Sequence, residues 1–159
     1  MLDVQGQLKR REQAAGSRLF ENAGPLLERL GAEEPYPSGA ALLARAREII
    51  DRLSEAEQIE VINAHPRIGE LPAKVSPDSF KEQGYDRDTT PPEVLLRLAR
   101  LNEEYEQKFG FRFVVFVNRR PKEAIVPVLE ARLRGTRDEE RRTALREILA
   151  IAADRLGRT

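Results

Sequence analysis

The sequence predicts an all-α fold, a single-domain helical bundle with one buried extended segment, over residues 1–159. Apolar residues recur at helical spacing along most of the chain, which is the pattern of amphipathic helices. Prolines, glycines and N-cap residues bound these stretches, as they do at helix ends. One short run, 111–117, has the β-branched and aromatic composition of a strand. With 159 residues and no internal repeat or linker, one domain is the expected organisation.

Two helices are expected near the N-terminus. An amphipathic stretch over 16–30 gathers its leucines, phenylalanine and alanine on one side and is expected to stop at Gly31. A second apolar stripe covers 41–53. Ser38, in the loop before it, is a suitable N-cap because its side-chain oxygen can accept a hydrogen bond from a free main-chain N–H.

A third, short helix is expected to end just before His65, the one histidine of the sequence. Ser54 and Glu57 have the spacing of a capping box, which places the start of this helix. Pro66 disfavours helical backbone at the residue before it, so His65 is expected outside the helix. There the free carbonyl groups of the helix end favour a protonated ring. In a chain without cysteine, His65 is therefore the best candidate for proton transfer near neutral pH.

The middle of the chain predicts a loop and then the longest helix. Glycine and prolines punctuate the loop over 67–78, and a second capping box follows at Ser79 and Glu82. The long helix is expected over 91–109, with two prolines at its start and Gly110 at its end.

The run 111–117 is followed by two closing helices, expected over 121–133 and 137–155. A single strand has nothing to pair with, so two interpretations stay open for this run, a true strand and a buried extended connector. In a connector, the main-chain polar groups need partners from elsewhere, and a planar, amide-rich ligand could supply them.

Composition excludes several classes of function. The 27 basic residues balance the 27 acidic ones, so the chain lacks the basic excess of a nucleic-acid binder. Zero cysteines and one histidine exclude disulfides, thiolate nucleophiles and the usual zinc sites, and no metal site is predicted, although a carboxylate site for magnesium stays open. The sequence lacks a signal peptide and any run near the ~20 apolar residues of a membrane span. We therefore expect a soluble cytoplasmic protein.

Each candidate residue also has a purely structural interpretation. His65 can simply bond to a carbonyl at the helix end, and the capping box at Ser79 and Glu82 needs no ligand. The same helix start can also hold a ligand through its main-chain N–H groups, with Gln83 turned toward it. Arg155, late in the last helix, is expected to be a solvated charge.

Taken together and in order, these motifs resemble the OHCU decarboxylase family, whose substrate is 2-oxo-4-hydroxy-4-carboxy-5-ureidoimidazoline (OHCU) of urate degradation. The resemblance extends from about Phe20 to Arg155, and its most specific part is the combination of the His-Pro pair with the motif in the long helix. The matching residues are His65-Pro66, Ser79-x-x-Glu82-Gln83, Leu101-Asn102-x-x-Tyr105-x-x-Lys108-Phe109-Gly110-Phe111-x-Phe113-Val114-Val115 and Arg155-Leu156.

The resemblance implies an all-helical enzyme that forms (S)-allantoin without a cofactor, often as a homodimer. It implies His65 and Glu82 as the catalytic residues. It also implies a set of substrate-binding residues, in which the extended segment uses main-chain groups: Pro66, Ser79, Gln83, Phe113, Val114, Val115, Phe116, Val117 and Arg155.

The sequence also departs from the family pattern. The loop between His65 and Glu82 is a few residues short, Arg112 replaces a frequent proline, and Asn118 replaces a frequent arginine. Two alternatives therefore stay open. One is an enzyme of the same fold acting on a related ureido or carboxylated heterocycle. The other is a non-catalytic helical interaction module, in which His65, Glu82 and Arg155 are surface residues.

Overall fold

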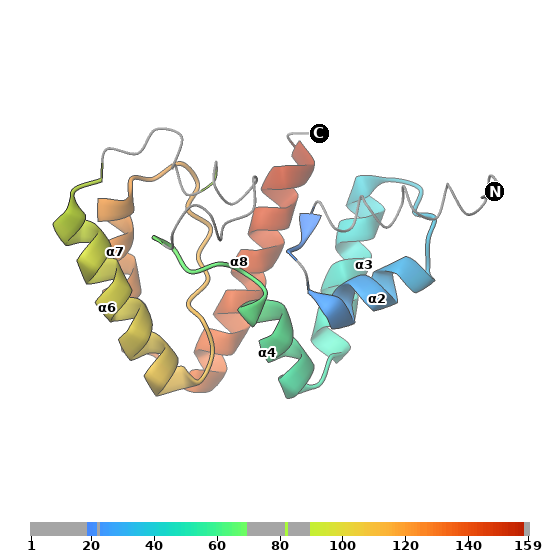
Figure 1. Cartoon of the computed structure of the whole chain (residues 1–159). Coiled ribbons are helices and arrows are strands. Elements are labelled where there is room, and N and C mark those ends of the chain that lie inside the picture. The colour runs from blue at the N-terminus through green and yellow to red at the C-terminus, as the bar shows by residue number, and fades with distance from the viewer. Residues whose placement is uncertain (1–18, 22, 70–81, 83–89, 158–159) are drawn as a thin grey trace, which may run out of the picture. The chain divides into compact units, whose positions relative to one another are not determined.

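The structure is a computed structural model that describes residues 19–21, 23–69, 82 and 90–157. Within these residues it contains six α-helices and no strand, so the all-α class is confirmed (Figure 1). The helices are α2 (Gly24–Ala32), α3 (Gly39–Arg52), α4 (Glu55–Asn63), α6 (Pro92–Phe109), α7 (Lys122–Arg132) and α8 (Arg137–Gly157). The chain forms two compact units, one from residues up to Ala64 together with those from Ile148 onward, the other from His65 to Glu147.

In the first unit α2 packs against both α3 and α4. The predicted N-cap is confirmed, because the Ser38 hydroxyl accepts a hydrogen bond from the Ala41 N–H at 3.1 Å. The predicted capping box is also confirmed, since Ser54 and Glu57 exchange side-chain to main-chain hydrogen bonds at the start of α4. Buried apolar side chains of these helices include Leu26, Leu30, Leu42, Ile49, Ile50, Val61 and Ile62.

The prediction of one helix over 16–30 is wrong in the part of it that the structure describes. Phe20 and Glu21 lie in a bend, and a new helix, α2, begins at Gly24. Pro25 explains this start, because its ring nitrogen carries no N–H and is best placed in the first turn of a helix. At the other end α2 continues through Gly31 to Ala32, so Gly31 does not end the helix.

The second unit contains α6, the chain that follows it, α7 and the beginning of α8. As predicted, α6 ends at Gly110, which has a left-handed φ of 80° that suits glycine. The chain then returns along α6, so that α7 runs in the same direction as α6 (Figure 1). Consistent with this, the Lys108 Nζ near the end of α6 donates to the Leu133 carbonyl at 2.5 Å, just beyond α7.

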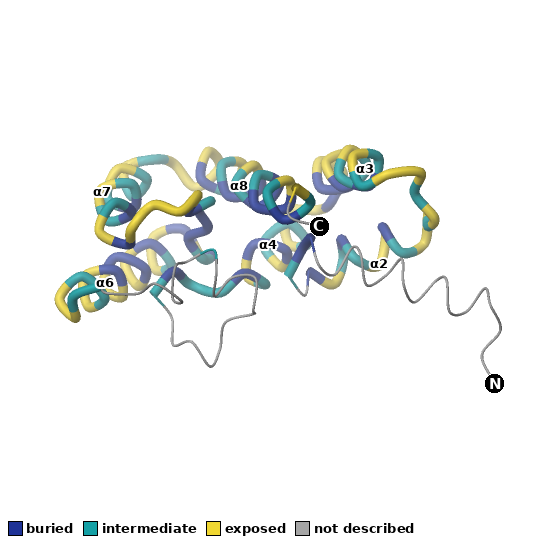
Figure 2. Tube along the Cα trace, turned by 90° about the horizontal axis from the view of Figure 1, so that it is seen from above, coloured by how far each residue is buried: buried dark blue, intermediate teal, exposed yellow. Residues whose placement is uncertain are grey.

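The buried face of α6 is aromatic. Buried residues follow one side of the helix and exposed residues the other (Figure 2). The ring of Tyr105 lies with its centroid 4.6 Å from that of Phe109 and 5.4 Å from that of Phe113. The cluster therefore joins α6 to the returning chain by apolar contact.

The run 111–117 is an extended connector and not a strand. Its main chain finds partners in side chains instead of a neighbouring strand. Arg132 Nη1 donates to the Val114 carbonyl at 2.6 Å, and Arg120 donates to the carbonyls of Phe116 at 2.6 Å and Val117 at 2.9 Å. These guanidinium groups supply hydrogen bonds that a sheet would otherwise provide, which is why an isolated extended segment can be buried.

Candidate active site

His65 lies immediately after α4, as its position before Pro66 predicted. Ala64 is the C-cap, and its N–H bonds to the Glu60 carbonyl to close the last turn. The imidazole-bearing residue is only 4% exposed. A buried ring directly after a well-formed helix has few conformations available, which suits a group that must transfer a proton to a fixed place.

Three polar contacts hold the four residues that begin with His65. Arg112 Nη1 donates to the His65 carbonyl at 3.0 Å, and Asn102 Nδ2 donates to the Ile68 carbonyl at 3.1 Å. Between them, the Arg67 guanidinium makes two hydrogen bonds to the Glu106 carboxylate, at 2.7 and 2.8 Å. The main chain around His65 is thereby tied to residues of α6 and of the extended segment.

A pocket of about 440 Å³ lies beside this segment. Asn102 is 3% exposed, and its Oδ1 has no hydrogen-bond partner among the residues that the structure describes. The wall thus offers an amide acceptor, carboxylates and a guanidinium, which suit a polar occupant; His65 itself is not among the described residues that line it. The lining residues are Arg67, Ile68, Gly69, Ala99, Asn102, Glu103, Glu106 and Gln107.

Sequence reasoning assigned no role to the polar residues of this pocket wall. A signal was present, because positions 99, 102, 103, 106 and 107 share one face of α6 at helical spacing. The sequence alone did not predict a pocket there, since nothing local shows that the segment after His65 folds over that face.

The family resemblance implies that the extended segment contacts the substrate through its main chain. Phe113, Val114, Val115 and Val117 are buried, and Phe116 is half-buried. Side chains form hydrogen bonds with several main-chain groups of this segment. One of these groups is the Phe116 N–H, which donates to Glu147 Oε1 at 3.4 Å. Among described residues, no hydrogen bond engages the main chain of Phe113 or Val115. The N–H and C=O groups of these two residues therefore have no hydrogen-bond partner within the described part of the chain.

Arg155 is buried at 4% exposure, so its interpretation as a solvated charge is wrong. Its Nη2 lies 2.8 Å from Glu21 Oε1, and its Nη1 donates to the Leu19 carbonyl at 3.4 Å. Glu21 compensates the buried positive charge. The sequence held a signal for this burial, because Ile151 and Ala152 stand four and three residues earlier on the same buried face of α8.

The remaining predicted site residues are only partly described. Glu82 and Pro66 are half-buried, while Ser79 and Gln83 lie outside the described residues. His65 belongs to the second unit and Arg155 to the first. The convergence of His65, Glu82 and Arg155 on one substrate therefore stays a prediction.

Two features of the described residues bear on other functions. They contain no group of three or more histidine or acidic residues arranged to hold a metal ion. None of the helices in the described ranges is long and apolar enough to cross a membrane.

Comparison with known proteins gives a consistent result. The OHCU decarboxylase family model matches residues 7–157. Over 140 residues the chain is 35% identical to a uric acid degradation bifunctional protein of Bacillus sp. (strain TB-90). The alignment covers 87% of this chain and 28% of that protein. It is 28% identical over 142 residues to the 2-oxo-4-hydroxy-4-carboxy-5-ureidoimidazoline decarboxylase of Haloferax volcanii, covering 89% of this chain and 84% of the relative.

A solved structure of OHCU decarboxylase in the presence of (S)-allantoin aligns with a TM-score of 0.75, covering 91% of this chain and 96% of the other at 23% identity. At that identity the likeness shows a shared fold. The chain spans about 28% of the length of the bifunctional relative and 84% of the length of the Haloferax volcanii relative. Because one family model matches nearly all of it, the chain belongs to the OHCU decarboxylase family.

Proposed function

We propose that this chain decarboxylates OHCU to (S)-allantoin in urate degradation, with His65 as the residue that transfers protons. The family match over residues 7–157 supports this proposal most strongly. The buried position of His65 at a helix end agrees with it, since the reaction needs a group that exchanges a proton near neutral pH.

The chemistry needs an electron sink and a proton. When the bond to the carboxylate breaks and CO₂ leaves, its electron pair forms a C=C bond to the carbon of the adjacent ring C=N group, and the nitrogen of that group takes up a proton. The ring hydroxyl then loses a proton, and the ring carbon that bears the ureido group gains one on a single face, which makes the product a single enantiomer. His65 acts in this sequence, either as base toward the hydroxyl or as acid toward the carbon.

The other residues of the proposed site bind and orient. The free peptide units of Phe113 and Val115 match the donors and acceptors of a ureido group or ring amide. Glu82 orients the imidazole, and Ser79 and Gln83 hydrogen-bond the substrate beside Pro66. Arg155 offers positive charge to an anionic group, in addition to its bond with Glu21. The prediction of a single domain over residues 1–159 is part of this proposal.

Replacement of His65 tests the assignment. A positioned acid–base group contributes about 100- to 10,000-fold in rate, so His65→Ala is expected to lower kcat by at least about 100-fold. The assay is circular dichroism of freshly generated OHCU, which separates enzymatic (S)-allantoin from the racemic product of spontaneous decay. Thermal unfolding of the variant serves as the control for folding. Full turnover by a folded His65→Ala protein would show that the assignment is wrong.

The same assay addresses the two alternatives. An enzyme for a related heterocycle would leave the racemic background unchanged with OHCU while turning over another ureido compound. The interaction module expects His65 and Arg155 at the surface, whereas both are buried at 4% exposure. This burial favours an enzyme over the module.

A cytoplasmic homodimer is the cellular form that we propose. The family resemblance is what supports this part of the proposal. Light scattering of the purified protein is expected to give twice the mass of one 18.1 kDa chain, and a monomer would refute this part of the proposal.

A further inference from the structure

Arg112 is the residue through which the extended segment reaches the main chain of His65. It stands 47 positions after His65 in sequence, and its Nη1 lies 3.0 Å from the His65 carbonyl oxygen. A hydrogen bond whose donor is a charged guanidinium is stronger than one between neutral groups. The carbonyl of His65 comes just after the end of α4, where no helical N–H follows to bond it.

Arg112 holds a different residue from those held by the neighbouring contacts. Asn102 holds the Ile68 carbonyl from the buried face of α6, and the Arg67–Glu106 pair holds the residue between. Both contacts hold residues that follow His65 in the sequence, not His65 itself. Arg112, in contrast, bonds to the main-chain carbonyl of the residue that bears the imidazole, so it acts directly on the position of that residue.

Arg112 also connects His65 to the peptide units that we propose for substrate binding. It directly precedes Phe113, whose main chain has no protein partner among the described residues. The Arg112 side chain thereby connects the extended segment, which we propose to contact the substrate, to His65, which we propose to exchange a proton with it. The length of the Arg112 side chain sets the distance between the main chain of the extended segment and the main chain of His65.

We infer that Arg112 is a positioning residue, which holds the His65 main chain at the distance from the Phe113–Val115 backbone that proton transfer requires. This inference rests on the proposed function, because it gives His65 its catalytic role. Displacement of a catalytic group by about 1 Å can cost about 100-fold in rate. Loss of the Arg112 bond is expected to lower kcat and to leave substrate binding nearly unchanged.

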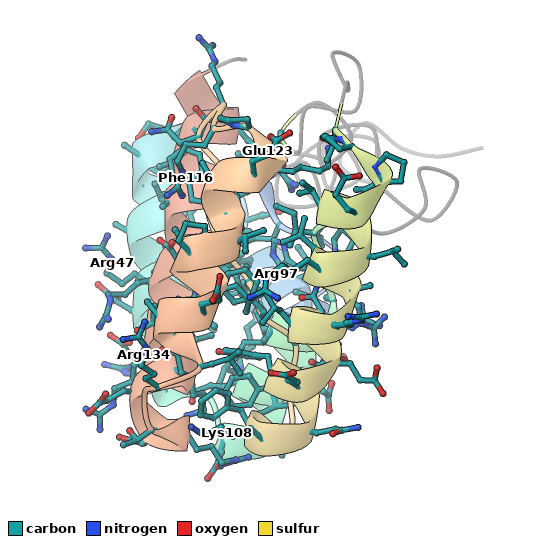
Figure 3. All side chains as sticks on the ribbon, turned by 90° about the vertical axis from the view of Figure 1, so that its left-hand side faces the viewer. Arg47, Arg97, Lys108, Phe116, Glu123 and Arg134 are labelled. Atoms are coloured by element: carbon teal, nitrogen blue, oxygen red, sulfur yellow. The ribbon has the colours of Figure 1, made fainter. Side chains whose placement is uncertain are left out.

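The main variant is Arg112→Met, which keeps the length of the side chain and removes every donor. We expect kcat for (S)-allantoin to fall about 10- to 100-fold, with KM within about twofold of the wild-type value. Arg112→Lys keeps a cationic donor and is expected to recover part of the lost kcat. The matched control is Arg97→Met, because Arg97 is an exposed arginine on α6 that pairs with Glu130 across to α7 (Figure 3). Its kcat is expected to equal that of the wild type.

A double variant tests whether Arg112 acts through His65. If it does, Arg112→Met in the His65→Ala background causes no further loss, because the group that it positions is gone. The same fold-loss in both backgrounds would show that Arg112 acts independently and would overturn the inference. So would a wild-type kcat for Arg112→Met.

Failure of the proposed function gives a different result. Full activity of His65→Ala alone refutes the role of His65, whatever Arg112→Met does. An inactive His65→Ala with a fully active Arg112→Met refutes only the positioning role. If Arg112→Met does not fold, Arg112→Ala is measured in its place, with the same expected fall and the same outcomes.

Discussion

The helix starts of the first unit and the extended segment of the second use polar side chains in different ways. In the first, Ser38, Ser54 and Glu57 bond to main-chain groups three positions away and place the ends of α3 and α4. In the second, Arg132 and Arg112 bond to carbonyls 18 and 47 positions away and hold irregular backbone. Short-range bonds place the ends of helices, whereas long-range bonds hold segments that have no regular structure of their own.

The difference has a consequence for function. Among the described residues that we propose for the site, His65, Phe113 and Val115 lie on irregular backbone of the second unit. Loops on a rigid scaffold often carry catalytic and binding groups. Backbone without a helix or sheet has peptide groups available to a ligand, but it needs outside support to stay in place. The arginines of α7 and of the extended segment supply that support.

The largest effect on stability is expected from a substitution in the most buried of these long-range hydrogen-bond networks. Glu140 accepts hydrogen bonds from Arg132 Nε and from the Tyr105 hydroxyl, each at 2.7 Å, and the side chains of Arg132 and Glu140 are 11% and 7% exposed. Glu140→Leu leaves the Arg132 charge buried without its partner. We expect a loss of about 3–5 kcal/mol in the free energy of unfolding, measured by urea denaturation.

The matched control is Glu130→Leu, which breaks the exposed pair of Glu130 with Arg97 on α6. That change is expected to cost less than about 1 kcal/mol, because solvent screens an exposed ion pair. Equal losses from Glu140→Leu and Glu130→Leu would contradict the importance that we give to the buried network.

A smaller effect is expected from the tyrosine of the same network. Tyr105→Phe removes one hydrogen bond to a carboxylate and is expected to cost about 1.5–3 kcal/mol at neutral pH. Burial, and then the hydrogen bond to Glu140, raises the pKa of Tyr105 above its ordinary value of 10.0. The folded protein therefore holds the phenol proton more tightly than the unfolded chain does. This contribution to stability is complete below pH 10 and declines as the pH rises further.

Urea denaturation between pH 8 and pH 11 checks this pH dependence. The wild-type protein is expected to lose stability more steeply above pH 10 than Tyr105→Phe does. The comparison with the variant is needed because the pKa of Tyr36 is also raised, first by burial, and Tyr36 titrates in both proteins. Parallel curves for the two proteins would show that Tyr105 does not contribute.

The smallest effect is expected in the first unit. Ser54→Ala removes the hydroxyl that caps α4 and is expected to cost about 1 kcal/mol. Ser54→Thr keeps a capping hydroxyl and should retain most of the stability. A loss from Ser54→Ala as large as that from Glu140→Leu would remove the distinction between the two units.

Much of the fold was predictable because its signals are local. Ser38, the Ser54–Glu57 box and Gly110 each mark a helix end through atoms a few positions away, and the helices they bound are found nearly where expected. The helix over 16–30 failed for the same kind of reason, since Pro25 is a local signal for a helix start that the apolar pattern outweighed.

The sequence by itself determined the all-α class, most helix ends and the position of His65 after α4. Only the tertiary structure decided that 111–117 is a connector, that Arg155 is buried against Glu21, and that Arg112 bonds to the carbonyl of His65. The physical reason is the distance along the chain between partners. A cap is complete within one turn, but a buried charge or an unpaired carbonyl finds its partner only when remote segments have packed together.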